Sequence, residues 1–335
     1  MKKLFYLFVL IFIPTFCFAQ PFKVFILHSY ELEHICGAPQ EQGARSVLIN
    51  SNIEIKTWAM DTKRKYNTST LIKQRAEEAI KLINEYNPDV LYTLDDNAFN
   101  HVGKKYIDHP KLKIVFSGMN AQPPNHRGVI ESWEKPGHNV TGVYEKLHVS
   151  TAFRIINEIV GTKVVAVLTD YSPTGEAITE QVLEELKENP VENVLWYITQ
   201  VRTFEDYKKW MEKLNTTVIP TALYPVALLL KDKEGKTYTA PEILKWTSEN
   251  SKIPTLTANY AFIRFGMFGG AGVDFYAMGK QAGNQILRIF NGEDPANISI
   301  EKAERYALIF NLTAAKKLGI EIPEDILLAA DEVIK

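Results

Sequence analysis

Short apolar runs alternate with longer amphipathic stretches along most of the chain, and this order occurs twice. Runs of about four to eight apolar residues with little polar alternation are typical of strands buried on both faces of a parallel sheet. We therefore expect strands at 23–27, 53–58, 89–94, 113–116, 163–168, 193–198, 218–223 and 254–257. Strands separated by helices predict an α/β fold with helices on both faces of mainly parallel sheets. Because the order repeats, we expect two similar lobes.

The amphipathic stretches predict the helices that connect these strands. In the stretch 69–86 apolar residues recur every three or four positions, and the pattern ends at Asn87, directly before Pro88. The same reasoning predicts helices at 39–48, 69–86, from about 98 onward, and at 149–160, 175–187, 203–214, 274–290 and 324–334. The proline-containing stretch 122–137 and the polar stretch 231–238 predict loops. The segment 139–145 lies between the two repeats and indicates a crossover from one lobe to the other.

The first residues have the composition of a secretory signal. Lys2 and Lys3 precede an apolar run at 4–13, and Ala19 stands where a signal peptide is cut. That run is shorter than the roughly 20 residues that span a bilayer, so we expect a signal peptide at 1–19, cleavage near Ala19 and a periplasmic or secreted protein. The alternative is an anchor retained at the N-terminus. Cleavage leaves Cys36 as the only thiol, which excludes an intrachain disulfide.

Length and charge limit the classes of function. With 335 residues, 46% of them hydrophobic, the chain is long enough for two cores of ordinary domain size. Its formal net charge is −2, and it has no basic tract of the kind that follows a phosphate backbone. We therefore do not expect a nucleic acid among its partners.

Polar and aromatic side chains follow most of the expected strands, where the chain leaves the sheet. In open parallel sheets ligands bind outside these carboxyl ends, so two lobes that face each other there form a cleft. Carboxylates suit an ammonium group, hydroxyl and N–H groups suit a carboxylate, and aromatic rings suit stacking. This mixture predicts a small polar solute such as an amino acid, or a purine or similar heterocycle. The candidate ligand-binding residues are His28, Tyr30, Asp95, Asp96, Ser117, Asn120, Tyr144, Asp170, Thr174, Tyr224 and Asn259.

Catalytic and metal functions have weaker support in the sequence. The best set for an enzyme is Asp95 and Asp96 with His28, but Asp96 equally suits the start of the next helix as a cap. The spacing of His28, His34 and Cys36 matches no common metal site. Cys36 beside His34 is either a nucleophile or an inert thiol, and inert thiols are commoner. We therefore expect no catalytic residues, no metal and no cofactor.

The glycine-rich run at 265–272 suggests a nucleotide-binding loop. It lacks the Gly-Lys-Ser/Thr of a phosphate-binding loop, and its glycines do not follow the dinucleotide fingerprint. Close approach of backbone at the boundary between the lobes explains these glycines better.

Several motifs together resemble a known family, and the resemblance covers nearly the whole chain after the leader. They are 139–143 following a strand that ends in Phe116-Ser117-Gly118, the run Gly270-Ala271-Gly272 leading to Gly279, and the tail from Ala315 to Ile334. In these motifs the chain resembles the type I periplasmic binding proteins, specifically the ABC transporter substrate-binding group that includes binders of tryptophan and other aromatic amino acids.

The resemblance implies an exported, non-enzymatic receptor. Its fold would be two Rossmann-like α/β lobes, with parallel sheets flanked by helices, joined by a hinge of three crossovers. The implied division is 20–143 with 264–300 for lobe 1, and 144–263 with 301–335 for lobe 2. A small-molecule ligand would be enclosed between the lobes and delivered to an ABC permease by a monomeric protein.

The sequence departs from that group at His28-Ser29-Tyr30 and in the loop Leu94-Asp95-Asp96-Asn97. These two stretches look more like relatives that provide the sensory input of membrane histidine kinases. The alternative partner is therefore the ectodomain of a sensor kinase.

Overall fold

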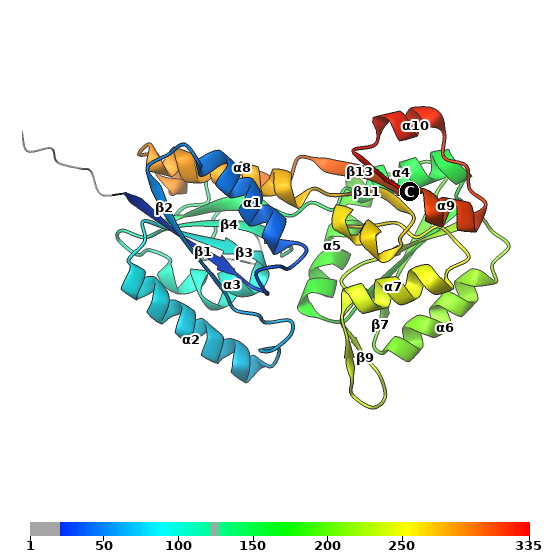
Figure 1. The fold of residues 1–335 in the computed structure, drawn as a ribbon, viewed down its shortest axis with the longest axis horizontal. Helices are drawn as coiled ribbons and strands as arrows, with labels where there is room; N and C mark the ends of the chain where they lie inside the picture. Colours follow the sequence, from blue (N-terminus) through cyan, green and yellow to red (C-terminus); the bar gives the residue numbers. More distant parts are fainter. Residues whose placement is uncertain (1–20, 122–125, 127) are drawn as a thin grey trace, which may run out of the picture.

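The computed structural model describes residues 21–121, 126 and 128–335. Its elements form two α/β lobes that lie side by side (Figure 1). The expected leader and residues 122–125 and 127 of the expected loop at 122–137 lie outside the described residues. Within the described part of the chain, no helix has the length and apolar character needed to cross a membrane.

The first lobe is built on a six-stranded parallel sheet with the order β12-β5-β4-β3-β1-β2. Its strands are β1 Phe22–His28, β2 Ile53–Ala59, β3 Val90–Leu94, β4 Lys113–Met119, β5 Val140–Tyr144 and β12 Glu301–Lys302. Its helices are α1 Gly37–Leu48, α2 Ser69–Tyr86, α3 Asp95–His101, the 3-10 turn η1 Gly103–Tyr106 and α8 Phe275–Phe290. The lobe thus combines the elements between Phe22 and Tyr144 with α8 and β12 from late in the chain.

Alternate residues of β1 face two different apolar layers. Val24 and Ile26 point toward the layer under α1 and α8, while Phe25 and Leu27 point toward the layer under α2 and α3. All four side chains are fully buried. A strand covered on both faces has no polar alternation, which is why β1 is apolar throughout its buried part.

The second lobe has a smaller parallel sheet that continues into a mixed one. The strands β6 Val164–Asp170, β7 Leu195–Val201 and β8 Thr221–Pro225 are parallel in the order β7-β6-β8. Single bridges from Leu223 to Thr255 and from Leu256 to Gly269 join this sheet to the one with the order β11-β13-β14. The strands of that second sheet are β11 Gly269–Val273, β13 Tyr306–Asn311 and β14 Glu332–Ile334.

Helices cover both faces of the second lobe. Apolar residues of β6 pack against α4 and α5 on one side, and against α6 and α7 on the other. The helices and the 3-10 turn of this lobe are α4 Val149–Val160, α5 Pro173–Glu188, α6 Phe204–Asn215, α7 Ala240–Asn250, η3 Tyr260–Phe265, α9 Leu312–Leu318 and α10 Glu324–Ala329. The 3-10 turn η4 Pro295–Asn297 lies beside β4 and β5 of the first lobe. The layered α/β arrangement agrees with the fold class expected from the sequence.

The structure corrects four of the expected elements. Residues 231–238 form a hairpin of β9 Leu230–Lys231 and β10 Thr237–Tyr238 rather than a plain loop. The stretch 254–257 contributes single bridges and no full strand. The helix expected from about 98 begins at Asp95. The helix expected at 324–334 ends at Ala329, because Asp331 accepts a hydrogen bond from the Leu308 amide and directs Val333 and Ile334 into a strand beside β13.

Strand pairing also moves the expected lobe boundaries. Residues 264–273 were placed with lobe 1, but β11 pairs with β13 of the second lobe. Residues 301–302 were placed with lobe 2, but they pair with β5 of the first. The glycines of β11 permit this pairing, because a Cβ at Gly269 would lie 2.1 Å from the Ile309 carbonyl oxygen.

Candidate functional site

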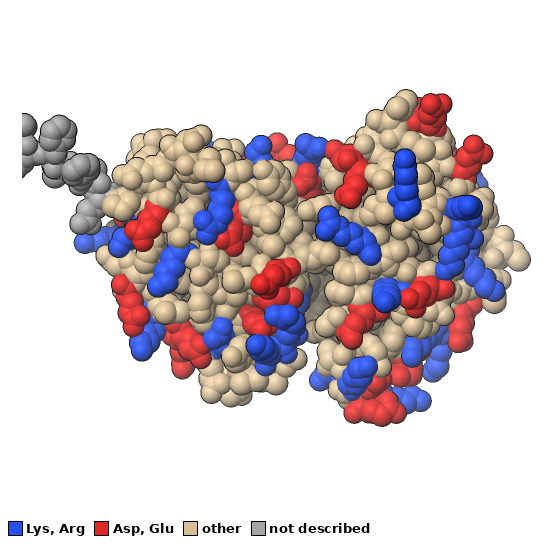
Figure 2. Space-filling model, in the orientation of Figure 1, with Lys and Arg blue, Asp and Glu red and all other residues tan. Residues whose placement is uncertain are grey.

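The carboxyl ends of β1, β3, β4 and β5 meet at one edge of the first sheet, next to the second lobe. The chain leaves these strands at His28, Leu94, Met119 and Tyr144. The residues that follow them are therefore neighbours in space although they are far apart in sequence. In Figure 2 the surface is hollowed between the two lobes, and acidic and basic side chains lie along the rim.

Three carboxyl groups gather at this edge. Asp95 and Asp96 start α3, and Glu145 follows β5 where the chain crosses to the second lobe. Burial raises the pKa of Asp95 to about 7, with Lys63 opposing the shift and the neighbouring Asp96 adding to it. Burial also raises the pKa of Asp96 and of Glu145, and for Glu145 the next largest causes are Asp95 and Asp96. These carboxyls therefore act on one another as a single cluster of like charge.

The backbone at Asp95 is held in an unusual conformation. Its φ angle is 66°, in the left-handed region that residues other than glycine rarely adopt. Such conformations cost about 1–3 kcal/mol and tend to occur where a site fixes a side chain. The side chain is 5% exposed and hydrogen bonds to Gln40 of α1. The strain thus fixes a buried carboxyl at the edge of the sheet.

Asn120 connects two of the acids. Its backbone N–H and its side-chain amide both donate to the Asp96 Oδ2 atom at 3.4 Å, and its side chain also hydrogen bonds to Glu145. Asn120 follows a bulge in β4, where Gly118 has a φ angle of 75°. A Cβ at Gly118 would lie 2.9 Å from the Gln40 Nε2 atom, so the glycine lets β4 and α1 approach closely.

Several acceptor atoms of the cluster have no donor. Asp95 Oδ2, Asp96 Oδ1 and Asn120 Oδ1 are buried without a hydrogen-bond partner. A buried polar atom without a partner costs roughly 1–3 kcal/mol, and more when it is charged. The atoms that lack partners here are acceptors, so they are suited to a ligand that brings hydrogen-bond donors.

Lys63 and Tyr30 complete the edge. The Lys63 ammonium lies 3.7 Å from the centroid of the Tyr30 ring, a cation–π contact. Lys63 lowers the pKa of Asp95, Asp96 and Glu145. Burial, followed by the charges of Asp95 and Asp96, raises the pKa of the Tyr30 hydroxyl well above its usual value. Lys63 is thus the positive charge that faces all three carboxyls.

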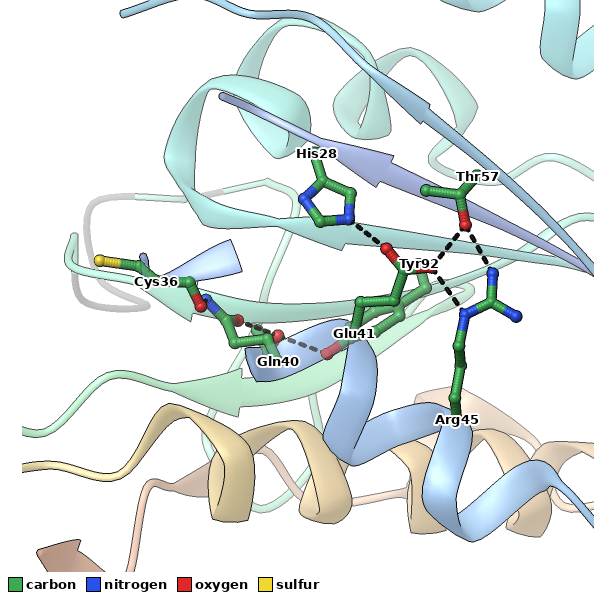
Figure 3. A network of polar contacts seen from close by, with 8 residues as sticks. His28, Cys36, Gln40, Glu41, Arg45, Thr57 and Tyr92 are labelled. Atoms are coloured by element: carbon green, nitrogen blue, oxygen red, sulfur yellow. Dashed lines mark hydrogen bonds and ion pairs between the residues drawn. The ribbon is translucent and has the colours of Figure 1, made fainter. Parts of the chain in front are cut away.

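His28 belongs to a hydrogen-bond network behind this edge (Figure 3). Its Nε2 atom lies 2.6 Å from Glu41 Oε2, and Glu41 Oε1 accepts from Arg45 Nε and from the Thr57 hydroxyl, each at 2.7 Å. Burial opposes ionisation of Glu41, but the hydrogen bonds from His28, Thr57 and Arg45 lower its pKa to about 2. The imidazole is 1% exposed, so the pair holds α1 against β1 and β2.

Ser117 and Tyr144 serve the interior of the first lobe. The Ser117 hydroxyl is fully buried, lies 2.6 Å from the Tyr92 hydroxyl and donates to Gln40 Oε1. The Tyr144 hydroxyl donates to the Asn120 carbonyl at 2.7 Å, and the Tyr144 ring packs edge-on against Trp133. Ser117 therefore supports α1 at Gln40, and Tyr144 supports the loop that carries Asn120.

The candidate residues of the second lobe do not form a single cluster. Asp170 is saturated by local bonds, since its Oδ1 accepts from Ser172 and its Oδ2 from the Leu229 amide. Thr174 lies half-buried in the first turn of α5. Tyr224 is fully buried with an unpartnered hydroxyl, and burial, then Glu185 and Glu145, raise its pKa. Asn259 caps η3 and donates from its amide to the Cys36 sulfur at 3.1 Å.

The geometry does not favour chemistry at Cys36 and His34. Burial raises the pKa of the Cys36 thiol well above its usual value, with Asp95 as the next contribution. Burial and the charge of Lys63 lower the pKa of His34 to about 2. A reactive cysteine needs a lowered pKa, so this thiol is poorly suited to act as a nucleophile. Among the described residues, no group of three or more His, Cys, Asp and Glu side chains is arranged to hold a metal ion.

The sequence reasoning missed Glu145, Lys63 and Gln40. Glu145 directly follows β5, as Asp95 follows β3, but the segment 139–145 was expected to be a crossover and not a strand. Lys63 lies in the loop after β2 and Gln40 in the first turns of α1. For these two residues nothing in the local sequence indicates the partner that they meet.

Comparison with known proteins places the chain among solute receptors. A family model described as "ABC transporter substrate binding protein" matches residues 32–334. A tyrosine-binding protein of Clostridioides difficile (strain R20291) is 22% identical over 201 residues, which are 59% of this chain and 55% of that protein. The match therefore spans about half the length of this curated relative.

Two solved structures share the fold. One is an ABC domain in complex with L-Trp from Streptococcus pneumonia, with a TM-score of 0.71, 16% identity, and coverage of 94% of this chain and 100% of the other. The second is the ligand-free, open structure of a substrate binding protein with adhesive properties from Clostridium difficile. Its TM-score is 0.66 at 18% identity, covering 93% of this chain and 99% of the other.

Proposed function

Because the chain belongs to the ABC transporter substrate-binding protein family, we propose that it captures a small solute with an amino group between its lobes and delivers it to a membrane permease. The proposal includes a location outside the cytoplasm after cleavage near Ala19, and binding by a monomer without catalysis. The relatives named for tyrosine and bound to tryptophan support an amino acid as the first ligand to test.

The observation that carries the proposal is the set of buried acceptors at the edge of the first sheet. Asp95, Asp96 and Asn120 each keep an acceptor atom without a donor, and Glu145 lies beside them. An ammonium group has three donors and no acceptor, so it supplies what these atoms lack. A bound ammonium would also replace the mutual repulsion of the carboxylates by attraction.

The two-lobed arrangement supports enclosure of the solute. Burial is the main cause of the raised pKa of Tyr30 in the first lobe and of Tyr224 in the second, and the charge of Glu145 makes a smaller contribution to both. Asn259 of the second lobe reaches Cys36 of the first. Side chains of both lobes therefore meet around the acid cluster, as closure on a ligand by a hinge requires.

Thermal unfolding of the purified protein with a panel of amino acids tests this function. A solute at about 100 times its dissociation constant stabilises the folded state by roughly 2.7 kcal/mol, which gives a clear rise in melting temperature. We expect at least one amino acid to give this rise, and the variant Asp95→Asn to lose it. The variant Asp108→Asn is the matched control, because Asp108 is 70% exposed and pairs with His138 away from the cluster.

A protein that shows no shift with any amino acid, and that carries no ligand through denaturation and refolding, contradicts the proposal. A covalent change in a bound solute during prolonged incubation would instead show that the site is catalytic.

A further inference from the structure

We propose that the preferred solute carries two cationic nitrogen groups, as an alkyl diamine or a basic amino acid does, and has net positive charge. This inference rests on the proposed function and names the class of solute for the same site. It follows from the balance of charge and of hydrogen-bond donors at the edge of the first sheet.

The charged groups around the cluster do not balance. Asp96 raises the pKa of Asp95, and both raise the pKa of Glu145, while Lys63 lowers the pKa of all three and Lys104 interacts with Asp96. When the acids are deprotonated, three carboxylates outnumber the ammonium groups of Lys63 and Lys104, so an excess of negative charge remains. The nearby His34 stays neutral, because its burial beside Lys63 lowers its pKa to about 2.

Neighbouring acids outside the cluster do not change this balance. The His28–Glu41 pair and Arg45 form a separate network behind the edge. Glu31 lies 3.6 Å from Arg64, which also contacts Asp61. In the second lobe, burial and then Glu185 raise the pKa of Tyr224, and Glu185 accepts a hydrogen bond from the Ser150 amide.

The missing hydrogen bonds point to the same class of solute. Asn120 is not an acid and is 6% exposed, and its Oδ1 atom is a buried acceptor without a donor. Asp95 Oδ2 and Asp96 Oδ1 lack donors as well. Two ammonium groups bring six N–H donors and no acceptor. A neutral zwitterion brings one ammonium and a carboxylate that itself needs donors.

Net charge therefore separates the candidate solutes. A zwitterion with a neutral side chain leaves the buried excess of negative charge unchanged, and this excess must be removed by protonation of the acids. A diamine or a basic amino acid has net positive charge and compensates this excess. The described residues contain no group of three His, Cys, Asp or Glu arranged around a metal ion, so an organic cation fits this site better than a metal.

Matched pairs of solutes test the inference with the full-length protein. Calorimetric titration compares 1,5-diaminopentane with 1-aminopentane, and L-lysine with L-norleucine, and includes L-tyrosine and L-tryptophan. Within each pair the chain length is the same and one cationic group is removed. We expect the dicationic member of at least one pair to bind about tenfold or more tightly than its partner, since a hydrogen bond to a charged group contributes on that scale.

The variant Glu145→Gln removes one charge and keeps the shape of the side chain. We expect it to reduce the preference within a pair by about tenfold, while Glu85→Gln, on the exposed face of α2, leaves it unchanged. Far-ultraviolet circular dichroism and the melting temperature establish that both variants are folded. Glu145→Asp, which keeps the charge, should retain most of the preference.

The outcomes separate this inference from the proposed function. If L-norleucine, L-tyrosine or L-tryptophan binds as tightly as the dicationic solutes, the inference is wrong and the proposed function stands. An unchanged preference in Glu145→Gln also overturns the inference. If neither the amines nor any amino acid binds, both proposals fail. Binding of 1,5-diaminopentane without L-lysine assigns the site to diamines, and the reverse assigns it to basic amino acids.

Discussion

The side-chain amide of Asn259 donates a hydrogen bond to the thiol of Cys36 across the two lobes, with 3.1 Å between Nδ2 and Sγ. Cys36 stands at the start of α1 in the first lobe, and Asn259 caps η3 in the second. The two residues are 223 positions apart in the chain, and their contact lies next to the acid cluster. This contact therefore reports how closely the lobes approach at the site.

The reactivity of the Cys36 thiol should increase when the lobes open. Burial raises its pKa and limits access, so we expect slow labelling by a maleimide in the closed state. A saturating ligand should slow labelling further, about tenfold or more. Asn259→Ala should speed it, because the amide that covers the sulfur is removed. Mass spectrometry of the labelled protein measures both rates.

The labelling rate of Cys36 in the unfolded protein is the upper limit for labelling of the folded protein. The substitution Asn250→Ala serves as the control, since Asn250 donates to the Trp246 carbonyl at the far end of α7. Equal labelling rates with and without ligand would show that Cys36 does not respond to closure.

The layout of strands and helices could be predicted because each buried strand is a continuous apolar run. The helix at 149–160 coincides with α4, and that at 69–86 coincides with α2. The helix expected at 324–334 was predicted incorrectly. The contact of Asp331 with Leu308 joins two distant parts of the chain, and a local sequence pattern carries no information about it. The pairing of β11 with β13 is likewise long-range.

The candidate site shows the same limit. Strand ends could be identified from the apolar runs, and Asp95 and Asn120 were found in this way. Lys63 follows no strand end directly, and only the fold brings its ammonium over the Tyr30 ring. Asp170 follows a strand as Asp95 does, yet its carboxylate is occupied by Ser172 and Leu229. Position at a strand end therefore predicts proximity, and the hydrogen bonds decide whether a group is available.

The variant Glu41→Gln should destabilise the first lobe. Glu41 accepts hydrogen bonds from Arg45 and Thr57 and pairs with the buried His28, so we expect a loss of about 2–3 kcal/mol at pH 7. The lowered pKa, about 2 in the folded state, means that this contribution is present above about pH 4.5 and is lost as the pH falls toward 2. Urea unfolding at pH 7 and pH 3 measures both effects, with Glu85→Gln as the exposed control.

Gly279→Ala should separate α8 from α1. A Cβ at Gly279 would lie 2.0 Å from the Gln40 carbonyl oxygen, so the two helices must move apart. We expect a loss of about 2 kcal/mol or more, although alanine favours a helix by about 1 kcal/mol over glycine. Lys280→Ala, at an exposed position of the same helix, should cost less than about 0.5 kcal/mol. Similar unfolding midpoints for both variants would show that the close approach is not needed.

The protein without ligand should become less stable as the pH rises from about 4 to about 7. Burial raises the pKa of Asp95 from 3.8 to about 7, so the folded state binds a proton that the unfolded state has already released. Each pKa unit corresponds to about 1.4 kcal/mol, which gives an effect of a few kcal/mol. Asp95→Asn should remove part of this slope and be more stable than the wild type at pH 8. Asp108→Asn should keep the wild-type slope, and a wild-type slope in Asp95→Asn would contradict the assignment.

Affinity for an amine should increase as the pH rises, whereas the stability of the ligand-free protein should decrease. An ammonium binds the carboxylate of Asp95, so below about pH 7 binding must first release a proton, and affinity should rise by up to about tenfold per pH unit. Above that pH the Asp95 contribution levels off. Two of the groups around this carboxyl, Asp96 and Glu145, are acids that also have raised pKa values. The other groups are Lys63, Tyr30, Cys36 and Gln40.

Calorimetric titration counts the protons released on binding. L-lysine, or the amino acid that binds best, is titrated between pH 5.5 and 8.5 in steps of about 0.5 pH unit, in buffers of different ionisation enthalpy. In Asp95→Asn the number of released protons should fall. Affinity that is independent of pH, with no proton release, would show that the solute does not bind at the acid cluster.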